Sequence, residues 1–154
     1  MTIATVTAGT LITPAWGNSV VDAINSFGVK GYGTVTTAQG PISTAGAALT
    51  GLSVTFTAEA GRLYQISATT APAVIATATE AVLVINANGT TIAASAAVLR
   101  SGGNFTGLPV TTHHAPGAIS VTYSLTMSAN AGTIQNVATS TVRSTITVVD
   151  IGPA

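Results

Sequence analysis

Residues able to do acid–base or metal chemistry are few and far apart in this sequence. The two histidines are adjacent, and the acidic residues stand singly, at Asp22, Glu59, Glu80 and Asp150. Hydrolysis needs a paired acid and base, a metal cluster or an activated nucleophile, and no Gly-x-Ser-x-Gly turn, phosphate-binding loop or glutamate-flanked His pair occurs. The absence of cysteine excludes thiolate zinc sites, cysteine nucleophiles and disulfides. The sequence therefore predicts a protein that is not an enzyme, with no catalytic residue, metal or cofactor.

Packing explains the histidine pair better than a metal site does. Neighbouring side chains on a β-strand point to opposite faces, so His113 and His114 of one subunit cannot chelate one metal together. We expect one of them to face solvent and the other to be packed. The alternative is that copies of one histidine meet on a three-fold axis, where they would bind a metal or respond to pH.

Charge is scarce along the whole chain. Charged residues make up 5% of the 154 residues, against about 25% in ordinary soluble proteins, and the net charge is zero. Such a surface is poorly protected against self-association, so we expect much of it to be covered in an assembly; the alternative is a monomer with a surface of Ser and Thr hydroxyls. The arginines are also candidates to pair with the carboxylates. Basic residues are too scattered to form a nucleic-acid-binding surface, at Lys30, Arg62, Arg100 and Arg143.

No segment predicts a membrane span or a secretion signal. The mean hydropathy of +0.58 is high because of Ala and Val, while Gly, Pro, Asn and Thr interrupt the long uncharged stretches. The N-terminus MTIATVTAGTLITPAWG lacks both the basic start and the compact apolar run of a secretion signal. We expect synthesis in the cytoplasm and neither a membrane nor a nucleic acid as partner.

The first element that positions side chains is a predicted helix in LITPAWGNSVVDAINSFG, residues 11–28. Residues 2–7 alternate in polarity and predict a short extended arm before it. Thr13 is suited to cap the helix, Pro14 to begin it and Gly28 to end it. Asn18, Asp22 and Asn25 lie toward its other side, and its apolar stripe consists of Trp16, Val20, Ile24 and Phe27. A helix this short needs a partner for the stripe, either its own domain or a neighbouring chain.

Residues 29–154 predict one all-β domain. A strand near 32–37 and a long irregular connection come first, and SVTFTAE and RLYQISATT then alternate as strands do. EAVLVINANGTTIAAS predicts a hairpin that turns at NANG, and GLPVTTHH with AISVTYSLTMS predicts a second hairpin. GTIQNVAT and STVRSTITVVDI close a series of about eight strands, which favours a sandwich or barrel and most readily a jelly roll. The run AVLVI, apolar on both faces, predicts a central strand or a contact between subunits.

Two end segments share a recognisable pattern. The matching residues are Leu11, Thr13, Trp16, Asn18, Val21 and Asp22, then Val148, Asp150, Ile151, Gly152 and Pro153. In this pattern the chain resembles small virion structural proteins of long-tailed phages, particularly those of actinobacterial hosts. In its pattern of short alternating strands, the β body resembles the tumour-necrosis-factor-like jelly rolls of phage decoration and fibre proteins.

The resemblance implies a homotrimeric virion protein with two parts, an anchoring arm and helix over residues 1–28 and a jelly-roll body over residues 29–154. Its implied partners are other copies of the chain and the major capsid protein, whose exterior it would decorate and stabilise. The implied docking residues are Trp16, Asn18, Val20, Ile24 and Phe27. The alternative is a minor tail or fibre protein that binds a host receptor or glycan, with SGGNFTGLP and HHAPG as contact loops. Copy number on the particle separates the two.

Overall fold

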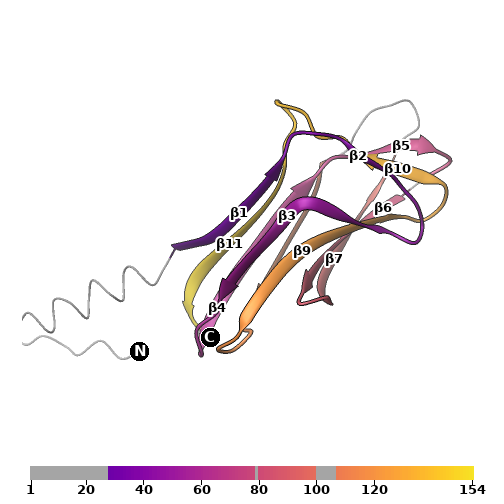
Figure 1. Ribbon diagram of the computed structural model, residues 1–154. Coiled ribbons are helices and arrows are strands. Elements are labelled where there is room, and N and C mark those ends of the chain that lie inside the picture. The colour runs from indigo at the N-terminus through magenta and orange to yellow at the C-terminus, as the bar shows by residue number, and fades with distance from the viewer. Residues whose placement is uncertain (1–27, 79, 100–106) are drawn as a thin grey trace, which may run out of the picture.

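The computed structural model describes residues 28–78, 80–99 and 107–154, and they fold into a β-sandwich without a helix (Figure 1). The strands are β1 (Gly28–Val35), β2 (Gln39–Ile42), β3 (Ala47–Thr57), β4 (Arg62–Thr70), β5 (Pro72–Ala76), β6 (Glu80–Ala87), β7 (Thr90–Val98), β8 (Leu108–His114), β9 (Ser120–Ala129), β10 (Thr133–Asn136) and β11 (Ser144–Pro153). The predicted all-β body is confirmed for these residues. The predicted arm and helix lie outside them. No helix within the described residues is long and apolar enough to span a membrane.

Eight strands form two antiparallel sheets that face each other across the core. Their orders are β1-β11-β4-β8 and β3-β9-β6-β7, so strands that pair are mostly distant in sequence. Successive long strands cross between the sheets everywhere except at β6–β7, which is the connectivity of a jelly roll. A third, small sheet of β2, β10 and β5 lies at the end of the sandwich away from the C-terminus (Figure 1).

One predicted hairpin is confirmed and the other is wrong. β6 and β7 pair through the turn at Asn88 and Gly89, both of which adopt positive φ, 48° and 82°. β8 instead pairs with β4, and β9 pairs with β3 and β6, so the segment between His114 and Ser120 crosses from one sheet to the other. Alternation of polarity identifies the faces of a strand but not its partner.

The predicted long irregular connection before residue 53 is also wrong. The first strand begins at Gly28, and β2 and the first half of β3 occupy much of residues 38–52. Small residues and Gly in this region weaken the alternation that reveals a strand. β2 and β5 were missed because they are short, whereas β10 lies within GTIQNVAT, which was predicted as a strand.

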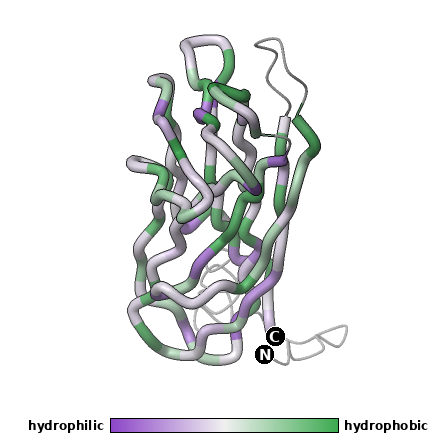
Figure 2. The backbone as a smooth tube through the Cα atoms, turned by 90° about the vertical axis from the view of Figure 1, so that its right-hand side faces the viewer, coloured by the Kyte–Doolittle hydropathy of each residue, from purple (hydrophilic) through white to green (hydrophobic). Residues whose placement is uncertain are grey.

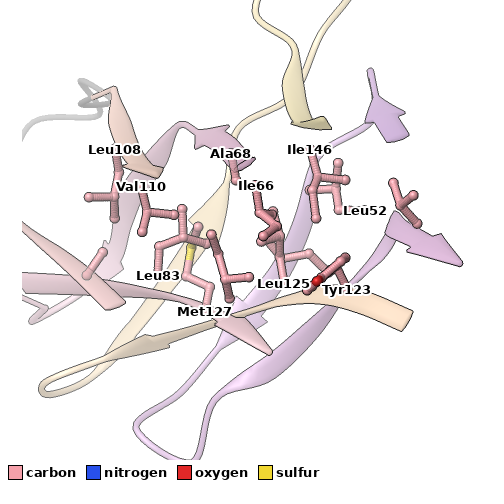
Figure 3. Packing of buried hydrophobic residues seen from close by; sticks show 14 of the residues in the cluster. Leu52, Ile66, Ala68, Leu83, Leu108, Val110, Tyr123, Leu125, Met127 and Ile146 are labelled. Carbon is pink, nitrogen blue, oxygen red and sulfur yellow. The ribbon is translucent and has the colours of Figure 1, made fainter. Parts of the chain in front are cut away.

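The core lies between the two long sheets. Tyr64, Ile66 and Ala68 point inward from β4 as their alternation predicts, at 0%, 0% and 3% exposed. Figure 3 shows Ile66 facing Leu125 across the interior. Full burial of each large apolar side chain stabilises the fold by about 1.5–3 kcal/mol, so these inward rows hold the two sheets together.

The run AVLVI belongs to β6, which lies between β9 and β7. It is thus a central strand, as one of the two predictions had it. Leu83 and Ile85 point into the core at 0% exposed. Val82 and Val84 point outward and are half-buried.

Candidate assembly face

On the outer face of the β1-β11-β4-β8 sheet, three rows of register partners contain no Asp, Glu, Lys or Arg, and Lys30 lies beside the first row at the β1 bulge. The twelve residues of these rows are Val29, Val149, Gln65 and His113; Tyr32, Thr147, Ser67 and Thr111; and Thr34, Thr145, Thr69 and Pro109. We call this set the assembly face. The residues that alternate with them along the strands point inward, so the strand period fixes which side chains form the face.

Side chains of the assembly face hydrogen-bond to one another. The Thr111 hydroxyl donates to the Ser67 hydroxyl at 3.2 Å, and the Gln65 amide donates to the same oxygen at 3.3 Å. Along the β1 edge, Val29 and Tyr32 are 65% and 53% exposed. A hydroxyl-lined sheet with an apolar and aromatic margin therefore faces outward, which is a composition suited to protein contact.

Charged residues lie at the ends of the sandwich instead. Within the described residues, Lys30, Glu59, Arg62 and Asp150 gather where β1 and β4 begin and β11 ends. Glu80 and Arg143 lie at the opposite end, where β6 and β11 begin. In Figure 2 the backbone is mostly white or green, with short purple stretches of hydrophilic residues.

Asp150 is the buried centre of the charged end. Arg62 donates to both of its carboxylate oxygens, at 2.7 and 3.1 Å, and Lys30 Nζ lies 3.6 Å from Oδ2. The Gly152 amide donates to Oδ1 at 3.0 Å. The hydrogen bond to Asp150 raises the pKa of the Arg62 guanidinium above its ordinary value. An arginine–carboxylate pair is thus confirmed here, and it ties β1, β4 and β11 together.

The two histidines point to opposite faces, as predicted. His113 belongs to the assembly face and is exposed, whereas His114 is half-buried and its Nδ1 lies 2.9 Å from the Tyr123 hydroxyl. Burial, with a smaller contribution from Tyr64, raises the pKa of Tyr123 to about 12. A hydrogen bond thus joins the buried phenol to the His114 ring, and the tautomer of His114 determines which of the two groups donates.

A second uncharged surface lies on the other sheet. The outward side chains in the middle of β6 and β7 are aliphatic, at Val82, Val84, Ala94 and Ala96, while Val98 pairs with Glu80 at one end of this surface and Asn86 pairs with Thr91 toward the other. Val98 is 76% exposed. The sandwich therefore has uncharged surfaces on both sides.

The residues expected to dock a partner, Trp16, Asn18, Val20, Ile24 and Phe27, all lie outside the described residues. Within the described ranges no group of three or more His, Asp or Glu side chains is placed to hold a metal ion. The assembly face itself was not predicted from sequence. Its signal was the Thr and Ser at alternate positions of β4 and β11, but only the register shows that these positions align across four strands.

No family model matches the chain, and no curated protein matches it. Among solved structures, the chain is similar to the structure of Eiger TNF from S. frugiperda, at 12% sequence identity and a TM-score of 0.47. The similarity covers 83% of this chain and 92% of that chain. A likeness this distant carries no argument about function.

Proposed function

We propose that this protein is a non-enzymatic structural subunit of a phage virion, a homotrimer that decorates and stabilises the capsid. Three subunits associate through the assembly face, and residues 1–28 attach the trimer to the major capsid protein. The subunit is made in the host cytoplasm and acts on the capsid exterior. The observation that carries this proposal is that the twelve residues of the assembly face, aligned across four strands, include no Asp, Glu, Lys or Arg.

The chemistry of the face supports self-association. Three rows of short side chains lie in register across the sheet, so a second sheet or edge can approach closely. Desolvating this face removes no ionic charge from water, which spares the large cost of burying charges. Val29 and Tyr32 add exposed apolar area at its margin, and aromatic residues of this kind are common anchors in interfaces.

A single charge placed in the centre of the face tests the trimer. Thr147 lies in the middle row on β11, and Thr147→Lys would bury an unpaired ammonium in the contact. We expect light scattering to give three times 15.1 kDa for the parent protein and a monomer for the variant at the same concentration. Ser124→Lys is the matched control, since Ser124 faces outward from β9, which also pairs on both sides in the other sheet.

A parent protein that stays monomeric at every concentration contradicts the trimer. If Ser124→Lys dissociates the trimer while Thr147→Lys leaves it intact, the contact lies on the other sheet. Purified particles then test the location: hundreds of copies per particle support decoration, and a handful place the protein in the tail. Deletion of residues 1–28 should abolish attachment to the particle and leave the body folded.

A further inference from the structure

A pocket of about 330 Å³ lies at the end of the sandwich where the β6–β7 turn meets the segment that follows β8. Its apolar lining includes Ile92, Pro116, Ile119 and Val121, and the His114 ring forms part of the wall. Ile119 is 48% exposed. The described lining contains no Asp, Glu, Lys or Arg, so the pocket suits an uncharged and apolar group.

Hydrogen bonds hold the walls of the pocket in place. Tyr123 is 0% exposed, its hydroxyl lies 2.9 Å from His114 Nδ1, and the two rings pack edge-on. Elsewhere in the lining, the Asn88 side chain accepts from the Thr122 amide at 2.8 Å and donates to the Ser120 carbonyl at 3.3 Å. Walls that are formed before a partner arrives lower the ordering cost of binding.

A group of aliphatic side chains lies at the opposite edge of the β1-β11-β4-β8 sheet. Val29 on β1 pairs with Val149 on β11, and Ile151 follows on the same outward side of β11. We call these three residues the aliphatic patch. Val29 is 65% exposed and Ile151 is 40% exposed. Aliphatic side chains grouped in this way at an exposed edge suit a contact with another apolar surface.

The register places the aliphatic patch and the pocket at the same height on opposite edges of the sheet. Gly28, Asp150, Tyr64 and His114 form one continuous row of partners across it. Val29 follows Gly28 directly, so it lies one residue step from this row. Three strand spacings, about 14 Å, separate the two edges. Val29 is therefore too far away to enter the pocket of its own subunit.

A closed ring of subunits brings two such surfaces together. Subunits around a three-fold axis meet head to tail, so one surface of each subunit contacts a different surface of the next. When the strands run along the axis, rotation leaves heights unchanged, and Val29 of one subunit lies level with the His114 pocket of the next. Other exposed apolar side chains do not meet this condition. Ile75 and Val98 lie at the opposite end of the sandwich, and Tyr32 lies farther along β1.

We propose that the pocket receives Val29 of the neighbouring subunit, so that each contact in the trimer joins the aliphatic patch of one subunit to the pocket of the next. The inference rests on the proposed trimer and deepens it by naming the two surfaces that meet. A valine side chain contacts the apolar lining and has no polar atom to leave unpaired. Val149 and Ile151 extend the contact over Ile119, which is partly exposed in the single subunit.

A disulfide tests this contact in the full-length protein, since the chain has no cysteine. Val29→Cys with Ala115→Cys places one thiol in the aliphatic patch and one in the pocket lining. Within one subunit they are about 14 Å apart, and a disulfide spans only about 4.4–6.8 Å between Cα atoms. On mild oxidation we therefore expect a covalent trimer on a non-reducing gel. Val98→Cys with Ala115→Cys is the matched control and should remain at monomer mass.

Charge substitutions test the same contact without a crosslink. Val29→Asp and Ile119→Asp each place a carboxylate in the contact, from opposite sides of it. We expect each to lower the association constant of the trimer by about tenfold or more, measured by light scattering over a concentration series. Ile75→Asp is the matched control, because Ile75 is also 48% exposed but lies on β5 at the other end. It should leave the association constant unchanged.

The outcomes separate this inference from the proposed trimer. A trimer that forms no disulfide-linked trimer, or that Val29→Asp and Ile75→Asp weaken equally, would overturn the inference and leave the proposed trimer standing. A parent protein that is monomeric at every concentration would overturn both. If Ile119→Asp leaves the trimer intact but releases it from the particle, the pocket binds the capsid protein instead, and the inference is wrong.

Discussion

At the scale of single residues, Asp150 connects three strands through one carboxylate. Its side chain is 0% exposed and that of Arg62 is 11% exposed, so the pair is removed from water. Asp150→Asn keeps the shape but removes the carboxylate charge that Arg62 and Lys30 face. We expect a loss of about 3 kcal/mol in the free energy of unfolding, measured by urea denaturation.

Glu80→Gln is the control for this prediction, because Glu80 lies at the opposite end of the sandwich. It should change the free energy of unfolding by no more than about 0.5 kcal/mol. Equal effects of the two substitutions would show that the charged end does not hold β1, β4 and β11 together.

Tyr123 makes stability depend on alkaline pH. Its pKa is about 12 in the folded protein and about 10 in an unfolded chain. The folded state therefore holds the proton more tightly, so its contribution to stability is complete below pH 10 and is lost as the pH rises to 12. The loss amounts to about 2–3 kcal/mol.

Tyr123→Phe removes this pH dependence together with the hydrogen bond to His114. At pH 8 the variant should be less stable by about 1 kcal/mol. Near pH 12 it should be the more stable of the two proteins, since only the parent has to keep a phenol protonated. Urea denaturation between pH 8 and 12 measures both; parallel curves would mean that burial of this phenol has no energetic consequence.

At the scale of elements, β1 packs closely against β3 because a glycine, Gly33, lies at the contact. A Cβ on Gly33 would lie 2.9 Å from the Gly51 carbonyl oxygen and 2.9 Å from Ile146 Cγ2. Gly33→Ala should therefore lower the free energy of unfolding by about 1–3 kcal/mol. Gly107→Ala, where nothing lies within 4 Å, should cost less than about 0.5 kcal/mol. A loss for Gly33→Ala as small as that of Gly107→Ala would indicate that β1 can move away from β3.

The elements also show what the sequence could and could not predict. Alternation identified β4, β9 and β11 as strands, because burial of alternate residues leaves a local record in the sequence. β6 was identified from its apolar run and the turn that follows it. The sequence of a strand carries no comparable record of which strand it pairs with. β8 and β9 were therefore expected to form a hairpin, although they belong to different sheets. The assembly face was missed for the same reason, since Thr147, Ser67 and Thr111 align only once the register is known.

At the scale of the whole molecule, the segregation of charge has a consequence for how copies associate. The described charged residues lie at the two ends, and the long sides of the sandwich are hydroxyl-rich or aliphatic. A contact through the assembly face would thus bury few charges, and salt screens only charge interactions. A contact through the end that carries Asp150 would bury charges, and salt would change its strength.

We therefore expect the association constant of the trimer to be nearly independent of salt. Between 50 mM and 1 M NaCl it should change by less than about threefold, because no ion pairs form or break in the contact. Ammonium sulfate should strengthen association, since sulfate favours burial of surface from water. Sedimentation equilibrium at each salt concentration measures this directly. A steep loss of association with NaCl would contradict a contact through the assembly face and place it at the charged ends, where Lys30, Glu59 and Arg62 gather around Asp150.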